Sequence, residues 1–292
     1  MAFTTIISTS DLAAHAEDPQ WSIVDCRFQL ADIAWGEREY RAAHIPRAVY
    51  AHLDRDLSGT VTGTNGRHPL PDASMLAATF GRLGIANGMQ VAVYDQDCGM
   101  FASRLWWLLR WMGHESVAVL DGGFARWMAE GRPVDTSGAD DSERATRRFT
   151  GTPREDMTVS LADLSALIGR PGSLLLDARA PERFRGDIEP IDRVPGHIPG
   201  AVNRFFQDNV GADGLLQSPD DLRRSISPTL AGVPIDRVVC YCGSGVTACH
   251  NLLAFEHAGL RGAKLYPGSW SEWSSDPARP VERSPKNERP AT

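Results

Sequence analysis

One series of short motifs occurs twice in the sequence, about 150 residues apart, and this repeat constrains the possible folds more than any other feature. An apolar run that ends in Asp-x-Arg occurs at 23–27 and at 175–179, and a His-Ile-Pro-x-Ala-Val motif occurs at 44–49 and at 197–202. Two further pairs follow in the same order, at 91–94 and 238–241 and at 117–127 and 263–273. We therefore expect two copies of one folding unit.

Each copy alternates short apolar runs with longer amphipathic segments. This alternation is typical of the α/β class, in which a mainly parallel sheet is flanked by helices. A chain of 292 residues has room for two such domains. We expect an N-terminal domain over 1–135, a linker without hydrophobic periodicity over 136–157, and a C-terminal domain with a charged tail over 158–292.

The overall charge and the N-terminus limit the possible partners. The formal net charge of −7 and the sequence pI near 5.6 disfavour a general surface for nucleic acid or an anionic membrane. The first residues contain no basic leader, and no stretch approaches the ~18 apolar residues of a membrane span. Five cysteines, an odd number without a signal peptide, favour reduced thiols. We expect a cytoplasmic protein that binds neither nucleic acid nor membrane.

Cys242 stands in a short loop between an expected buried strand at 238–241 and an expected helix at 247–259. The two glycines of this loop allow several backbone N–H groups to point at one position, and the helix N-terminus adds partial positive charge. Positive potential ionises a thiol and makes it a strong nucleophile. The loop can therefore stabilise a thiolate or a persulfide anion at Cys242. The alternative is an ordinary glycine-rich turn with a buried cysteine.

The first copy has Asp95 at the position that Cys242 occupies in the second copy. A carboxylate cannot carry sulfur as a thiolate does, and the nearby Cys98 is displaced within that loop. We therefore expect the C-terminal domain to hold the chemistry. The N-terminal domain is expected to be catalytically silent and to support it.

Three motifs of the second copy resemble one family. The run Cys-Gly-Ser-Gly-Val-Thr-Ala at 242–248 resembles the active loop of 3-mercaptopyruvate sulfurtransferases, within the wider rhodanese (thiosulfate sulfurtransferase) family. The motifs at 196–203 and 266–273 are similar to other signatures of that family, and the similarity extends from about residue 8 to residue 273. The resemblance implies two tandem rhodanese-like domains and a sulfurtransferase that carries sulfur as a persulfide on Cys242.

Because the loop is electropositive, its substrate is expected to be a small anion, and arginines follow an expected strand of the second copy. Arg179, Arg183 and Arg185 lie where α/β folds bind ligands, and a guanidinium can bind both oxygens of a carboxylate. The resemblance implies that Arg183 binds the substrate anion, with Arg193 as a second candidate. The alternative is that these arginines form surface salt bridges. The loop residues expected around the bound sulfur are Gly243, Gly245, Val246 and Thr247.

The resemblance also implies a contribution from the first copy. In this family an aspartate and a histidine of the first domain reach the serine of the active loop, and Asp54, His68 and Ser244 match those positions. They would form a relay that moves a proton beside the sulfur. The alternative is a loop histidine without a catalytic role. Structural roles are expected for His44 and His197, and Trp35, Trp270 and Trp273 are candidates for the pocket wall or for the core.

The expected reaction is a double displacement. The Cys242 thiolate takes sulfur from 3-mercaptopyruvate, pyruvate leaves, and the persulfide passes its outer sulfur to cyanide or to a thiol. A thioredoxin-like protein is one candidate for the thiol acceptor. Neither a metal nor an organic cofactor is expected.

Four other functions compete with this one. Thiosulfate is the alternative donor, although the neutral residues that follow Cys242 favour a singly charged donor. A cysteine phosphatase needs an arginine six residues after the cysteine, where this chain has Ala248. A metal site formed by Cys240, Cys242, Cys249 and His250 lacks the usual ligand spacing. A sulfur-relay module without turnover is the last alternative.

Overall fold

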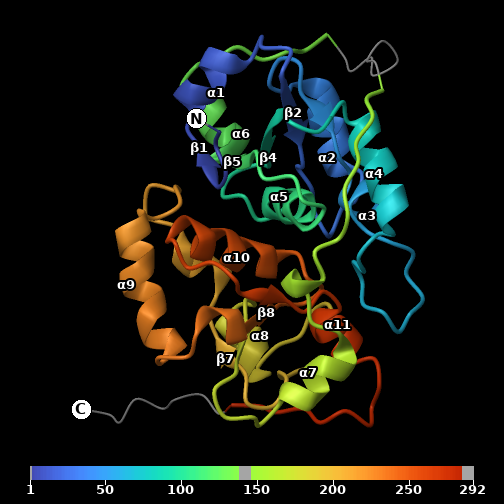
Figure 1. Ribbon diagram of the computed structural model, residues 1–292, viewed down its shortest axis with the longest axis vertical. Helices are drawn as coiled ribbons and strands as arrows, with labels where there is room; N and C mark the ends of the chain where they lie inside the picture. The colour runs from blue at the N-terminus through green and yellow to red at the C-terminus, as the bar shows by residue number, and fades with distance from the viewer. Residues whose placement is uncertain (1, 138–145, 285–292) are drawn as a thin grey trace.

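The computed structural model describes residues 2–137 and 146–284, and these residues form two α/β halves. In Figure 1 the N-terminal half, coloured blue to green, lies above the C-terminal half, coloured yellow to red. Each half has its own sheet, and in both sheets all strand pairs are parallel. The predicted α/β class with parallel sheets is confirmed.

The sheet of the N-terminal half has the strand order β1-β5-β4-β2-β3. Its central strand β4 is buried along its whole length, as expected for an apolar strand that helices cover on both faces. The strands are β1 (Ile6–Ile7), β2 (Trp21–Asp25), β3 (Val49–Tyr50), β4 (Gln90–Tyr94) and β5 (Val117–Leu120).

Two helices of this half begin at residues whose side-chain oxygens cap them. Ser8 accepts a hydrogen bond from a backbone N–H of the first turn of α1, and Asp72 does the same for α4. The helices are α1 (Thr9–His15), α2 (Trp35–Ala42), α3 (Leu53–Asp56), α4 (Ala73–Arg82), α5 (Ala102–Trp111) and α6 (Gly123–Ala129).

The C-terminal half repeats this plan with the strand order β7-β6-β8-β9. The predicted strand at 238–241 is confirmed as β8, and the predicted helix at 247–259 is confirmed as α10, which ends two residues before Gly259. The counterpart of β1 is reduced to an isolated bridge between Thr158 and Leu265. The strands are β6 (Leu174–Asp177), β7 (Val202–Asn203), β8 (Val238–Tyr241) and β9 (Lys264–Leu265), and the helices are α7 (Leu161–Leu167), α8 (Pro181–Arg185), α9 (Pro219–Leu230), α10 (Thr247–His257) and α11 (Ser269–Trp273).

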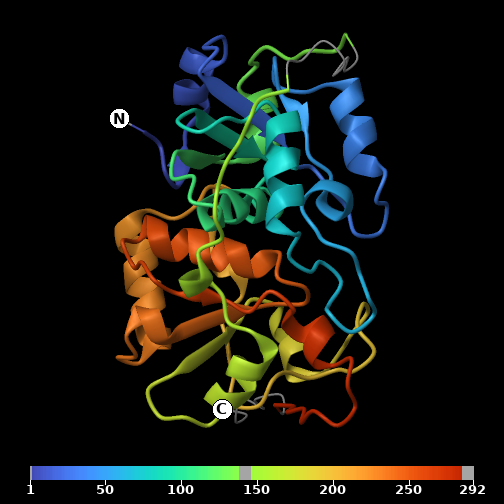
Figure 2. The same cartoon turned by 45° about the vertical axis from the view of Figure 1, so that its right-hand side comes forward.

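The two halves share one hydrophobic core. Helices α5 and α10 lie against each other between the two sheets, as Figures 1 and 2 show. Every residue of α5 is buried, in keeping with its mostly apolar sequence, and its two arginines, Arg104 and Arg110, are buried as well. One cluster of buried side chains runs from β4 through α5 and α10 to β8. The interface also contains an ion pair between Arg110 of α5 and Glu256 of α10, with an N–O distance of 2.8 Å.

The described parts of the expected linker and tail are bound to the two halves. Phe149 is buried and packs edge-on against Phe80, with 5.0 Å between the ring centroids, and a short 3₁₀ helix η2 (Glu155–Met157) follows. In the tail, Glu282 pairs with His197 through two backbone hydrogen bonds of 2.9 and 3.0 Å. The tail is therefore held on the C-terminal half as far as this bridge. The rest of the expected linker, 138–145, and of the tail, 285–292, lies outside the described residues.

None of the helices in the described ranges is both long enough and apolar enough to cross a membrane.

Candidate active site

Cys242 follows the carboxyl end of β8 and faces the first turn of α10. Its side chain is 2% exposed, and its sulfur accepts a hydrogen bond of 3.2 Å from the backbone N–H of Gly245. Gly245 has a φ of +78°, and a Cβ there would lie 2.5 Å from the carbonyl oxygen of Pro267. Only glycine fits this position. The loop therefore directs a backbone donor and the N-terminus of a helix at the sulfur.

The equivalent loop of the N-terminal half already holds an anion. The Asp95 carboxylate accepts hydrogen bonds from the backbone N–H groups of Asp97 (3.2 Å), Gly99 (2.9 Å), Phe101 (2.7 Å) and Ala102 (3.1 Å). Burial raises the pKa of Asp95 to about 6, in spite of these hydrogen bonds. This fold therefore builds an anion-binding nest at the start of the helix that follows the central strand.

The two nests correspond from their glycines onward, although the loop that begins at Asp95 is one residue longer than the loop that begins at Cys242. Counted back from the glycines that follow α5 and α10, Gly99 corresponds to Gly245, and both donate their backbone N–H to the residue after the strand. By the same count, the N–H groups that bind the far oxygen of Asp95 correspond to those of Thr247 and Ala248. By analogy with Asp95, we expect these two N–H groups to be the donors for a sulfur atom attached to Cys242.

Asp54, His68 and Ser244 come together across the interface between the halves. His68 Nδ1 lies 2.7 Å from Ser244 Oγ, and His68 Nε2 lies 3.1 Å from Asp54 Oδ1. The His68 hydrogen bond lowers the pKa of Asp54, and burial lowers the pKa of His68. The histidine is therefore neutral near pH 7, with Nε2–H donating to Asp54 and Nδ1 accepting from the Ser244 hydroxyl.

Two guanidinium groups, those of Arg67 and Arg183, lie over Gly243 at the mouth of the loop. A Cβ at Gly243 would lie 2.9 Å from Nη2 of Arg67 and 3.6 Å from Nη2 of Arg183. Arg183 is paired with Glu189 (2.7 Å) and Asp192 (3.3 Å), and Arg67 is paired with Asp192. An anionic substrate would therefore meet two arginines that carboxylates hold in place.

Of the other candidate arginines, Arg179 lines the cavity at Cys242, whereas Arg185 and Arg193 do not. Arg193 is exposed and is absent from the wall of the cavity at Cys242, so the structure does not bring this predicted substrate-binding residue to the site. Arg179 is buried in an ion pair with Asp177 at 2.7 Å, which repeats the pair of Arg27 and Asp25 in the other half. Arg185 is paired with Asp187 away from the cavity.

A cavity of about 290 Å³ opens above Cys242 between the two halves. The predicted tryptophans do not line it: Trp270 and Trp273 are buried in the core of the C-terminal half, and Trp35 lies outside the cavity. Apolar side chains form the wall instead, and Val246 is the only one of them that was predicted from the sequence. These are Leu30, Met100, Phe101, Ile191, Phe205, Phe206 and Val246.

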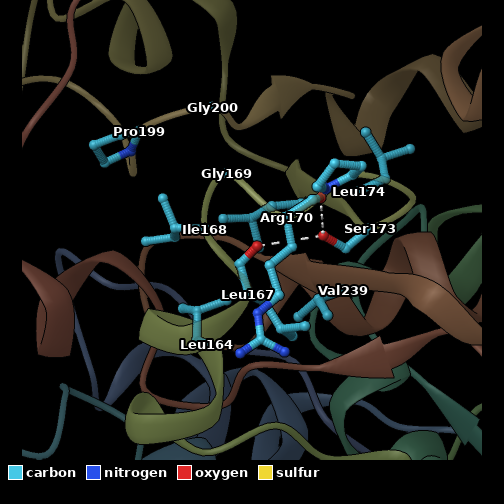
Figure 3. A pocket seen from close by; sticks show the side chains of 12 residues that line it. Leu164, Leu167, Ile168, Gly169, Arg170, Ser173, Leu174, Pro199, Gly200 and Val239 are labelled. Atoms are coloured by element: carbon cyan, nitrogen blue, oxygen red, sulfur yellow. Dashed lines mark hydrogen bonds between the residues drawn. The ribbon is translucent and has the colours of Figure 1, made fainter.

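A second cavity of about 290 Å³ lies at the opposite end of the C-terminal sheet. Figure 3 shows that its wall consists mostly of hydrocarbon side chains, among them Leu164, Ile168 and Val239, with no sulfur among the side chains drawn. The Ser173 hydroxyl donates to the carbonyl oxygens of Leu167 and Arg170 and is thereby satisfied. This cavity brings together no groups for acid–base or nucleophilic chemistry.

The remaining histidines near the motifs bind backbone carbonyls. Nδ1 of His44 lies 2.7 Å from the Tyr40 carbonyl oxygen, and Nδ1 of His197 lies 2.7 Å from that of Phe184, in keeping with the predicted structural roles. His250 Nε2 lies 2.9 Å from the carbonyl oxygen of Cys98, in the other half. Among the described residues, no group of three or more metal-ligating side chains converges.

Sequence reasoning missed two arginines at this site. Arg67 directly precedes His68 in the chain, and the expected position of His68 at the active loop was the signal that could have identified it. Arg104 is buried in α5 and donates to the carbonyl oxygen of Gly245 at 3.1 Å. The available signal for Arg104 was its position in a mostly apolar helix.

Both halves of the chain match the model of one protein family. The family is the rhodanese-like domain, and its model matches residues 8–130 and again residues 160–276. The two matches include the loops of Asp95 and Cys242.

Several known proteins are similar over almost the whole chain. A probable 3-mercaptopyruvate sulfurtransferase of Pseudomonas aeruginosa is 47% identical, over 96% of this chain and 99% of that protein. A putative thiosulfate sulfurtransferase of Mycobacterium tuberculosis is 39% identical, over 95% of this chain and 96% of that protein. Among solved structures, the 3-mercaptopyruvate sulfotransferase SseA of Escherichia coli matches with a TM-score of 0.79 at 30% identity, covering 92% of this chain and 99% of SseA.

Proposed function

Since this chain belongs to the rhodanese family and is a sulfurtransferase, we propose that it transfers sulfur from 3-mercaptopyruvate to a thiophilic acceptor through a persulfide on Cys242. The membership confirms the predicted fold class and the predicted enzyme class. The observation that carries the proposal is the position of the Cys242 sulfur, which accepts the Gly245 N–H in a nest at the start of α10 and faces a cavity between the halves.

In the first half-reaction, the Cys242 thiolate attacks the sulfur of mercaptopyruvate. The new S–S bond forms as the C–S bond of the donor breaks, and the carbon leaves with the bonding electrons as the enolate of pyruvate. The proton of the donor thiol must reach that carbon to give pyruvate. Cys242 is left as a persulfide anion, and the total charge does not change.

We assign the movement of this proton to Ser244, His68 and Asp54. The neutral imidazole accepts from the Ser244 hydroxyl, which leaves the serine oxygen free to accept the proton of the donor thiol. Asp54 accepts from His68 Nε2, which fixes the ring and stabilises positive charge on it during transfer. The three residues would thus carry the proton from sulfur toward the enolate carbon.

In the second half-reaction, a nucleophile attacks the outer sulfur of the persulfide. Cyanide leaves as thiocyanate, or a thiolate leaves as a new persulfide, and Cys242 returns to a thiolate. We propose a cellular thiol as the physiological acceptor, with a thioredoxin-like protein as a specific candidate.

Arg183 would bind the carboxylate of the donor, with Arg67 as the second cation. Replacing Arg183 by Gln is expected to raise the KM for mercaptopyruvate by about 10- to 100-fold, since a charge-assisted pair of hydrogen bonds is lost. The matched control is Arg193→Gln, which removes an exposed arginine of the same half. Equal KM values for the two variants would exclude Arg183 as the binding residue.

Thiosulfate is the second candidate donor. The presence of two guanidinium groups at the mouth of the loop favours it, because thiosulfate carries two negative charges. Turnover of both donors by the same preparation decides between them. A larger kcat/KM for thiosulfate would make the protein a thiosulfate sulfurtransferase with the same cysteine.

Two further proposals concern the whole chain. We propose the division into an N-terminal domain over 1–135, a linker over 136–157 and a C-terminal domain over 158–292, which the separate family matches at 8–130 and 160–276 support. We also propose a cytoplasmic location, because all five cysteines are free thiols. Fractionation of the producing cells tests the location.

A further inference from the structure

Arg104 is a buried cation beneath the active loop. Its side chain is fully buried in the first turn of α5, and Nη1 donates to the carbonyl oxygen of Gly245 at 3.1 Å. Nη2 donates to the carbonyl oxygen of His68 at 3.0 Å, and Nε has no hydrogen-bond partner among the described residues. The guanidinium therefore joins the loop of Cys242 to the segment that holds His68.

No carboxylate in the described ranges forms an ion pair with Arg104, although a buried charge costs several kcal/mol unless it is paired. Arg110, six residues further along α5, has the usual carboxylate partner of a buried arginine, since it is paired with Glu256 at 2.8 Å. Among the described residues, the acceptors of Arg104 are backbone carbonyl oxygens and the Cys249 sulfur, and none of them is a carboxylate. An anion that forms during the reaction would complete its environment.

Two cysteine sulfurs lie close enough to interact with Arg104, those of Cys249 and Cys242. Burial raises the pKa of Cys249 to about 12, and its thiol donates to the Gly245 carbonyl oxygen at 3.3 Å. Cys249 is therefore a neutral thiol at ordinary pH. Cys242 is the remaining partner, and its sulfur faces the cavity and the nest.

The nest of the N-terminal half shows why a cation is needed. Four backbone N–H groups surround Asp95, yet burial still raises the pKa of this carboxyl to about 6. A nest of this kind therefore does not fully offset the desolvation of an anion. A thiol starts from a pKa of about 8.5, so it needs a further source of positive potential to ionise near pH 7.

The two halves differ in the residue that supports the opposite loop. Arg104 of α5 binds the loop of the C-terminal half, and His250 of α10 binds the loop of the N-terminal half through the Cys98 carbonyl oxygen. Burial lowers the pKa of His250 to about 4, so the histidine is neutral. Of these two supporting residues, Arg104 carries a positive charge and His250 does not, so the loop of Cys242 is the one supported by a cation.

We propose that Arg104 is the buried counter-cation of the sulfur anion on Cys242, a positioning residue that holds both the thiolate and the persulfide ionised. The proposal rests on the proposed function of Cys242 as the sulfur carrier. The charged and titratable groups that face this sulfur are Arg104 of α5, Cys240 of β8, Arg179 after β6, Arg183 of α8, Cys249 of α10, and Arg67 and His68 of the segment before α4.

The direct test is the pH dependence of Cys242 alkylation by iodoacetamide, followed by intact-protein mass spectrometry. In Arg104→Gln, the midpoint for Cys242 is expected to rise by at least about one pH unit, which lowers the alkylation rate near pH 7 about tenfold. Arg104→Lys keeps the charge and is expected to stay within about threefold of the unchanged protein. An unchanged midpoint in Arg104→Gln would overturn the proposal.

Arg110→Gln is the matched control, because it removes another buried arginine of α5 that crosses the interface. It is expected to lower stability and to leave the Cys242 midpoint in place. If Arg110→Gln raises the midpoint as much as Arg104→Gln does, the effect is merely structural and the proposal fails.

A second measurement does not require an Arg104 variant to fold. If Arg104 stabilises the thiolate, folding favours the ionised form of the Cys242 side chain. The Tm difference between the unchanged protein and Cys242→Ser should then grow as the pH rises toward the unfolded thiol pKa of about 8.5. A difference that does not change with pH would contradict the proposal.

These outcomes separate this proposal from the proposed function. If the unchanged protein forms a persulfide on Cys242 but Arg104→Gln ionises normally, only the role of Arg104 fails. If no persulfide forms, the proposed function fails, and the midpoints still decide whether Arg104 ionises Cys242.

Discussion

His68 is the residue through which the N-terminal half would enter the chemistry. Its ring lies between Ser244 and Asp54, at 2.7 and 3.1 Å. The role assigned to it is needed only when the donor brings a proton on its sulfur, as mercaptopyruvate does. Thiosulfate brings no such proton, so the two donors distinguish a proton relay from a structural histidine.

We predict that His68→Asn lowers kcat with mercaptopyruvate by about 10²-fold or more, the usual contribution of general acid–base catalysis. The loss with thiosulfate should be much smaller, which steady-state kinetics with both donors will measure. His114→Asn, a change at another buried histidine of the same half, is the control. Equal losses with the two donors would contradict the relay.

The protonation of His68 gives a second prediction. Burial lowers the pKa of His68, and the hydrogen bond to Asp54 opposes that effect. We predict an NMR titration midpoint for His68 below the ordinary value of about 6.5, and a still lower midpoint in Asp54→Asn, which removes the opposing carboxylate. A midpoint that rises in Asp54→Asn would refute this electrostatic account.

The sequence predicted the residues of this site that lie in recognisable motifs. Cys242, Ser244, His68 and Asp54 lie close together in the structure. Arg104 could not be predicted, because its role depends on a contact between two segments that are far apart in the chain. Arg193 was the predicted second arginine at the mouth of the loop, whereas the structure has Arg67 there. Arg67 could not be predicted for the same reason, because it reaches the loop from a distant part of the chain.

At the scale of the elements, both halves form an anion-binding nest at the start of the helix that follows the central strand. The Asp95 carboxylate uses both oxygens as acceptors, with Phe101 and Ala102 donating to Oδ2. An asparagine at this position would turn one acceptor into an N–H donor that faces those two N–H groups.

Asp95→Asn is therefore expected to lower the free energy of unfolding by about 1–3 kcal/mol, because buried donors lose their acceptor. Chemical denaturation will measure the loss. Sulfur-transfer kcat should be retained, because Asp95 lies outside the cavity at Cys242. Asp97→Asn, at an exposed position of the same loop, is the control, and equal stability of the two variants would argue against the nest.

The hydrophobic pattern predicted some helices and strands more accurately than others. Strand β8 and helix α10 were predicted within two residues, because an apolar run and a glycine mark their ends. The loss of a full counterpart of β1 was not predictable, since the isolated bridge of Thr158 depends on packing against β9.

At the scale of the whole molecule, the repeat predicted two similar halves but not how they meet. Helix α5 is buried on all sides because α10 and its own sheet enclose it. The site needs this interface, since the relay and Arg104 both reach the Cys242 loop from the other half. The two halves should therefore unfold together.

We predict that Glu256→Gln lowers the free energy of unfolding by about 1–3 kcal/mol, since it removes one carboxylate from buried Arg110 at the interface. Unfolding should remain a single transition when circular dichroism and tryptophan fluorescence are compared. Arg38→Gln, which breaks an exposed ion pair, should leave the stability unchanged. Two separate transitions in the unchanged protein would contradict a shared core.

The central claim is that Cys242 carries the transferred sulfur, and mass spectrometry of the intact protein tests it most directly. After treatment with mercaptopyruvate, the protein should gain the mass of one sulfur atom, and cyanide should remove it with release of thiocyanate. Cys242→Ser should show no gain. A gain that persists in Cys242→Ser, or its absence in the unchanged protein during turnover, would contradict the account.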